Sequence, residues 1–134
     1  MLLETVDRHI VEYGVADFVV GHYGNFDRLA ASVVKTTKEH HPEVMLTLLL
    51  PYYPYDRPTP FSDGFDGTFY PPGMETTPKR AAIVRANRYM IDHSTHIICY
   101  VKHAASNSSA LLKYARAREK RGLIHIENIS ATMN

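Results

Sequence analysis

The chain has few of the features that mark secreted or membrane-spanning proteins. Its 134 residues include one cysteine, Cys99, so a single chain can form neither an internal disulfide nor a zinc site of several thiolates. This cysteine usage is typical of a reducing compartment, and we expect a cytoplasmic protein. No apolar run approaches the roughly 20 residues that cross a bilayer. The N-terminal segment carries acids among its apolar positions, so it predicts no secretion signal and no membrane partner.

Neither sign of charge is in excess. Fifteen Lys and Arg residues against fourteen Asp and Glu residues give a formal net charge of +1. This balance supplies no overall field to attract duplex DNA or anionic lipid, which disfavours nucleic acid as a partner. A hydrophobic share of 45% and a charged share of 22% are those of a globular protein. The length fits one domain, predicted over residues 1–134.

Helical and strand patterns alternate along the chain. Apolar residues at helical spacing predict helices over 3–13, from the N-cap Asn25 to His40, over 79–93, and from the polar segment 103–109 to a stop at Gly122. Short apolar runs predict buried strands over 16–20, 45–50, 96–101 and 123–126. This order predicts an α/β fold, a three-layer Rossmann-like domain with a mainly parallel four-stranded sheet flanked by helices.

Residues 51–78 interrupt this alternation. They hold seven of the eight prolines and seven of the fourteen aromatic residues, which predicts a long structured loop. Such loops are often lids or binding loops. Its aromatic side chains either stack on the base of a ligand or anchor the loop to its own domain.

Two strand-to-helix turns are the first candidate binding segments, because ligands of parallel sheets bind beyond the carboxyl ends of the strands. Each turn also fits an ordinary chain reversal or helix cap. The candidate ligand-binding residues are Gly21, His22, Tyr23, Gly24 and Asn25 in the first turn, and His103, Ser106, Asn107 and Ser108 in the second.

The helix over 79–93 supplies further candidates. Its guanidinium groups suit bidentate contact with phosphate, although a solvated helix face is the alternative. The candidates on it are Arg80, Arg85, Asn87 and Arg88. Asp27 and Glu75 are the carboxylates we consider for catalysis. We expect no metal site, because His93 should end a helix while His96 begins a strand, so the two do not share one rigid face.

Five sequence blocks carry a family resemblance, which spans Thr5 to Ile126. They are FVVGHYGNFDRLAA, LTLLLPY, FDGTFYPPGMETTPKR, AIVRANRYMIDHSTHIICYV and HAASNSSALLKYARAREKRG. In this order they resemble the YspA/YpsA-related branch of the SLOG superfamily. These Rossmann-like proteins include the LOG phosphoribohydrolases, the DNA-uptake protein DprA and sensors of nucleotide-derived signals. The resemblance implies a nucleotide-like ligand at 21–25 and 103–108. We expect no cofactor.

Two departures from the family pattern shape the functional prediction. Where LOG enzymes have a PGGxGTxxE motif, this chain has residues 102–110, with Ala110 at the position of the catalytic glutamate. We therefore expect binding or sensing of a nucleotide-like molecule. The alternatives are a nucleoside-monophosphate N-glycosidase using Glu75 or Asp27, and a DprA-like binder of single-stranded nucleic acid. Family members also begin with a strand that this sequence lacks. Either the sheet has only four strands, or a partner or an upstream segment supplies the fifth, and we expect a homo-oligomer as one remedy.

Overall fold

The computed structural model describes residues 1–21, 24–52, 64–102 and 107–132. The chain forms two compact units, Met1–Thr77 and Pro78–Asn134, each with its own helices and strands. None of the helices in the described residues combines the length and the apolar character that crossing a membrane requires.

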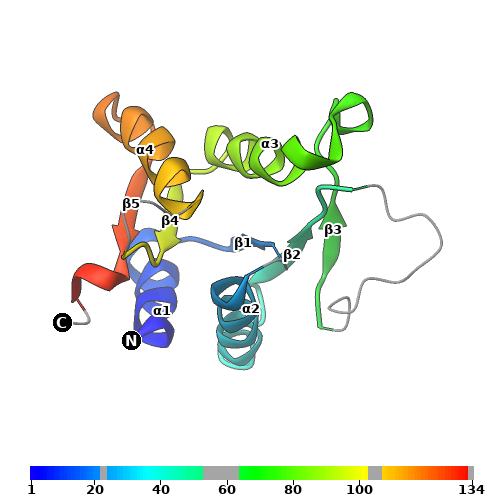
Figure 1. Cartoon of the computed structure of the whole chain (residues 1–134). Helices are drawn as coiled ribbons and strands as arrows, with labels where there is room; N and C mark the ends of the chain where they lie inside the picture. The colour runs from blue at the N-terminus through cyan, green and yellow to red at the C-terminus, as the bar shows by residue number, and fades with distance from the viewer. Residues whose placement is uncertain (22–23, 53–63, 103–106, 133–134) are drawn as a thin grey trace. The chain divides into compact units, whose positions relative to one another are not determined.

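The first unit is built on a three-stranded sheet. Its elements are α1 (Leu2–Tyr13), β1 (Asp17–Val20), α2 (Asn25–Lys38), β2 (Met45–Leu49), β3 (Gly67–Phe69) and the short 3-10 helix η1 (Met74–Thr76). The strands lie in the order β1-β2-β3 and both pairs are parallel. Helix α2 packs on β1 and β2, and α1 packs against α2 (Figure 1). The segment from β1 through α2 to β2 is thus one βαβ unit.

The central strand β2 carries most of the buried apolar surface in this sheet. Leu46 and Leu48 are completely buried, because β2 has a neighbouring strand on each side and α2 on one face. Ala31 and Val34 are the buried apolar residues of α2, and their spacing of three places them on one side of the helix. α1 ends at Tyr13 and is capped by Gly14, whose φ of 68° is the left-handed conformation typical of a helix stop.

The second unit contains a two-stranded parallel sheet and two helices. Its elements are α3 (Lys79–Asp92), β4 (His96–Cys99), α4 (Asn107–Lys120), β5 (His125–Asn128) and the 3-10 helix η2 (Ile129–Thr132). α3 packs against α4, and α4 packs on β5. The core consists of Ile91, Ala115, Ile124 and Ile126.

The predicted α/β class with parallel strands is confirmed, but the predicted four-stranded sheet is wrong. The described residues form sheets of three and two strands. The additional strand, β3, lies in the segment predicted as a loop. It pairs with β2 because the Asp66 amide donates to the Leu46 carbonyl oxygen and the Leu50 amide donates to that of Phe69, both at 2.8 Å.

Two predicted element boundaries are also corrected. Gly24, in extended conformation, caps α2, and Asn25 is the first helical residue. The last strand is displaced by two residues, because Leu123 and Ile124 follow the left-handed Gly122 and pairing with β4 starts at His125.

Candidate functional site

The turn after β1 places an acidic side chain at the start of α2. Gly21 follows the strand, Gly24 caps the helix, and Asp27 lies in the first helical turn. A carboxylate at this position interacts favourably with the positive end of the helix dipole. Of the residues predicted for this turn, His22 and Tyr23 lie outside the described part of the chain.

The Asp27 carboxylate lies directly beside the glycines of this turn. A Cβ atom added at Gly21 would stand 3.1 Å from Asp27 Oδ2, and one added at Gly24 would stand 3.7 Å from the same oxygen. Any side chain at Gly21 would therefore push against the carboxylate. The glycine-rich turn thus leaves space that Asp27 partly fills, so a phosphate placed there would face a negative charge.

A pocket of about 160 Å³ extends from this turn along α2. Its lining residues on the helix recur at spacings of three and four, so they occupy one side of it. The pocket is lined by Gly21, Asp27, Arg28, Ala31, Ser32, Lys35 and Phe65. It therefore combines a carboxylate, two cationic side chains, a hydroxyl and an aromatic ring.

The far end of the pocket is formed by Lys35 and the segment before β3. The Lys35 ammonium lies 4.6 Å from the centre of the Phe65 ring, a cation–π contact. The absence of a side chain at Gly64 leaves room for Lys35, because an added Cβ would stand 2.9 Å from Lys35 Cε. The φ of Gly64 is 85°, a conformation that favours glycine. A larger residue at Gly64 would strain the backbone and displace the lysine.

Asp66, the residue after Phe65, anchors this segment to β2 and α2. Its carboxylate accepts a hydrogen bond from the Leu46 amide at 2.8 Å and one from Lys38, with which it forms a salt bridge. The hydrogen bonds from Lys38 and Leu46 hold the pKa of Asp66 below its ordinary value of 3.8. Asp66 therefore connects α2 to the start of β3 and positions the aromatic wall of the pocket.

The other predicted site residues do not line this pocket. Glu75 is exposed on η1. Arg80, Arg85 and Arg88 are exposed on α3, and Asn87 is half-buried there. The Arg88 guanidinium lies over the ring of Tyr114, 5.1 Å from its centre, so it has a packing contact within the second unit.

The second predicted turn belongs to the second unit and is described only in part. His103 and Ser106 lie outside the described residues, whereas Asn107 and Ser108 begin α4, and Ala110 lies in its first turns. Val101, just before the turn, is held by Asn128. The Val101 amide donates to Asn128 Oδ1, and Asn128 Nδ2 donates to the Val101 carbonyl oxygen, both at 3.0 Å.

A cluster of three polar side chains also joins α3 to α4 in the second unit. The Tyr114 hydroxyl donates to both carboxylate oxygens of Asp92 at 2.8 and 3.0 Å, and Arg118 lies 3.4 Å from the same carboxylate. The hydrogen bond to Asp92 raises the pKa of Tyr114. Asp92 thus ties the end of α3 to α4.

Neither a family model nor a curated protein matches the chain. The resemblance to the SLOG superfamily remains a prediction.

Sequence reasoning found two lining residues of the pocket, Gly21 and Asp27, and missed the others. Arg28, Ser32 and Lys35 follow Asp27 at helical spacing, so a search for a polar stripe on α2 could have found them. Phe65 has no such signal, because only the pairing of β3 with β2 brings it to the helix.

Proposed function

We propose that the protein is a Rossmann-like binding or sensing protein for a nucleotide or nucleotide-derived small molecule, and that the pocket along α2 takes the sugar and phosphate of this ligand. The observation that carries the proposal is the combination of Asp27, Arg28 and Lys35 in one pocket beside the turn after β1. Ligands of open α/β sheets bind beyond the carboxyl ends of the strands, where this turn lies.

The charges in the pocket favour one orientation of the ligand. Arg28 and Lys35 attract the phosphate, since both are cations and donate charge-assisted hydrogen bonds. Asp27 accepts hydrogen bonds from the sugar hydroxyls and repels the phosphate away from Gly21. The phosphate therefore lies toward Lys35, and the sugar lies next to the glycine turn.

The size of the pocket limits what it encloses. Its volume of about 160 Å³ is below the roughly 300 Å³ at which sites for drug-sized ligands begin. It therefore holds a sugar phosphate, and the base of a nucleotide extends beyond it. Stacking of aromatic side chains from residues 51–78 on this base is one of the two roles predicted for them, and residues 53–63 lie outside the described part of the chain.

The resemblance to the SLOG superfamily supports the same ligand class. In those proteins the ligand is a nucleotide or a related signal, and the fold is Rossmann-like. The βαβ unit of β1, α2 and β2 is the repeating element of such folds.

The test is isothermal titration of the full chain with nucleoside monophosphates, NAD-derived compounds and ribose 5-phosphate. We expect Lys35→Gln to weaken binding about tenfold, as loss of roughly 1.4 kcal/mol of charge-assisted hydrogen bonding would do. Asp27→Asn should weaken the binding of compounds that carry sugar hydroxyls more than it weakens the binding of inorganic phosphate. Lys113→Gln, an exposed lysine of α4, is the charge-matched control. Absence of heat with every compound would reject the proposal.

The position of Asp27 in the pocket favours a second candidate function, that of an enzyme. A nucleoside-monophosphate N-glycosidase needs a carboxylate near the sugar to stabilise positive charge or to activate water. Asp27 lines the pocket, whereas Ala110 has no carboxylate and Glu75 does not line it. Release of free base from a nucleotide panel, abolished by Asp27→Asn and retained by Glu75→Gln, would establish this activity.

A further inference from the structure

The near-zero net charge of the chain is the sum of two opposite charges. The second unit, residues 78–134, holds ten Lys and Arg residues against three Asp and Glu residues, a formal net charge of +7. The first unit, residues 1–77, holds five against eleven, a formal net charge of −6. The balance that disfavours nucleic acid as a partner therefore applies to the whole chain and not to the second unit. Such asymmetry between the halves of a chain is typical of contact with nucleic acid or a membrane surface.

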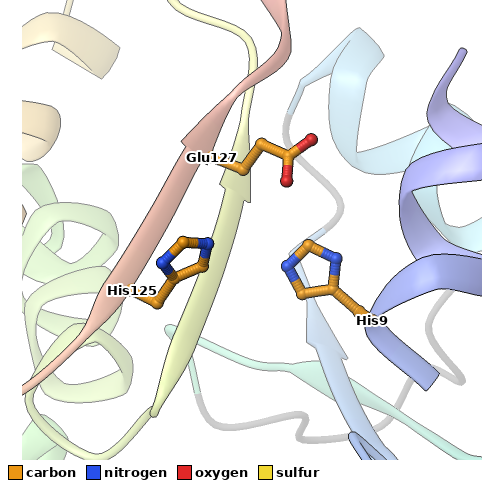
Figure 2. Close-up of side chains that lie close together, drawn as sticks. All are labelled: His9, His125 and Glu127. Carbon is orange, nitrogen blue, oxygen red and sulfur yellow. The ribbon is translucent and has the colours of Figure 1, made fainter. Parts of the chain in front are cut away.

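The three acids of the second unit do not cancel the charge of its helices. Asp92 pairs with Arg118 at 3.4 Å, and Glu119 pairs with Arg116 at 2.8 Å. Glu127 follows a core residue of β5, and successive side chains of a strand point to opposite faces. It therefore projects from the face of the sheet turned away from this core, and Figure 2 shows its side chain leaving β5. The remaining bases keep a positive field around α3 and α4.

Exposed bases line α3 and the end of α4. Arg85 and Arg88 are three residues apart and therefore share one side of α3. Arg88 also lies over a ring of α4, and α3 packs against α4, so the bases of the two helices adjoin (Figure 1). We call this surface the basic face, and it consists of Arg80, Arg85, Arg88, Lys120 and Arg121.

Two bases stand at the end of α3 where the helix dipole opposes them. α3 begins with Lys79 and Arg80, and neither α3 nor α4 has an acid in its first turn. The first turn of a helix carries a partial positive charge that favours anions and disfavours cations. Local conflicts of this kind are expected at functional sites. A bound polyanion would remove the conflict.

The other side chains of the two helices distinguish between polyanions. Among the described residues of α3 and α4, Val84 is the one large apolar side chain that is exposed, so there is no apolar stripe to enter a membrane. The tyrosine rings of these helices are covered, Tyr89 by stacking on His93 and Tyr114 by Arg88. The helices therefore lack the stacking platform on which binding of single strands depends. A duplex keeps its bases stacked and presents closely spaced phosphates, which suit guanidinium groups.

We propose that the basic face binds duplex DNA through its phosphates, without reading the base sequence. α3 and α4 each have 14 residues, which is about 21 Å of helix or the length of roughly six base pairs. The negative first unit repels the duplex, so the second unit faces it. The basic face is independent of the pocket along α2.

The experiment is fluorescence anisotropy of a labelled duplex of about 20 base pairs, titrated with the full chain between about 50 and 200 mM salt. On a logarithmic plot of association constant against salt concentration we expect a slope of about −4, since each neutralised phosphate contributes about −0.9. Affinity should therefore fall roughly 250-fold over this range. Arg85→Gln and Arg121→Gln should each make the slope shallower by about 0.9.

Two control variants separate charge from structure. Arg85→Lys keeps the charge and should keep the slope. Arg8→Gln removes a base from α1 of the first unit and should also leave the slope unchanged. Circular dichroism melts identify a variant that fails to fold.

Three results would overturn the proposal. The first is no binding of the duplex at the lowest salt with about 100 μM protein. The second is a slope that Arg85→Gln and Arg121→Gln leave unchanged. The third is tighter binding of a single strand of the same length, of polyglutamate or of phosphatidylserine vesicles than of the duplex, which would assign the basic face to another polyanion.

Discussion

Asp27 lies against Gly21 at the start of α2, with its Oδ2 atom 3.1 Å from the position that a Cβ on Gly21 would take. The first turn of the helix and the end of β1 are thereby coupled through one carboxylate. Because Asp27 also lines the pocket, the backbone of the turn determines where a ligand meets negative charge.

Gly21→Ala tests this coupling. The new methyl group should displace the carboxylate by a few tenths of an ångström and lower affinity for a nucleoside monophosphate by about tenfold, or roughly 1.4 kcal/mol. Gly24→Ala is the matched control, because its Cβ would stand at an ordinary contact distance of 3.7 Å. Calorimetry measures both. Equal affinity of the two variants would contradict the coupling.

Asn128→Asp tests how Val101 is held. The aspartate still accepts from the Val101 amide, but an oxygen replaces the Nδ2 donor and faces the Val101 carbonyl oxygen. The Ser130 hydroxyl also donates to this carbonyl oxygen, at 2.8 Å, and contacts Asn128. We expect the free energy of unfolding to fall by about 1–3 kcal/mol in both Asn128→Asp and Asn128→Ala. Urea denaturation measures the change. Unaltered stability in Asn128→Asp would contradict a stabilising role for the two hydrogen bonds between Asn128 and the Val101 backbone.

Asp66 predicts a pH dependence of stability. Its pKa is lower in the folded chain than its ordinary value of 3.8, because Lys38 and the Leu46 amide donate to it. Its stabilising effect is therefore complete above that ordinary value and is lost as the pH falls through the lower folded value. The stability difference between the unaltered chain and Asp66→Asn should vanish at the acid end of this range. Asp17→Asn, at an exposed position of β1, is the control. Thermal melts over a pH series measure the difference in stability between the unaltered chain and Asp66→Asn. A difference that persists at the lowest pH would contradict the stabilising role of the Asp66 carboxylate.

Cys99 should react slowly with thiol reagents in the folded protein. Burial in the core of the second unit raises the pKa of its thiol from 9.0 to about 11. This lowers the thiolate fraction at neutral pH about a hundredfold relative to an ordinary thiol, and the thiolate is the reactive species. Labelling should accelerate on addition of urea. A rate equal to that of a free thiol without denaturant would show that Cys99 is accessible.

The sequence pattern predicted elements better than it predicted their pairing. α2 was predictable because its apolar residues repeat at helical spacing, and the strand at 45–49 because it is one continuous apolar run. β3 was missed because three residues are too few to show a period. The number of sheets was missed because pairing depends on contacts such as that between Asp66 and Leu46, which are distant in sequence.

The same distinction applies to the candidate site. Gly21 and Asp27 were predicted from local turn and helix chemistry. Phe65 reaches Lys35 only through the pairing of β3 with β2, and the Cβ-free backbone of Gly64 makes the approach possible.

Amide chemical-shift mapping tests the central proposal most directly. In a titration of the isotope-labelled full chain with a nucleoside monophosphate, we predict saturable shifts at Gly21, Asp27, Arg28 and Lys35. The same titration of Lys35→Gln should need about tenfold more ligand to reach the same shifts. Shifts that are absent, or that occur only away from these residues, would contradict the assignment of the pocket along α2 as the nucleotide site.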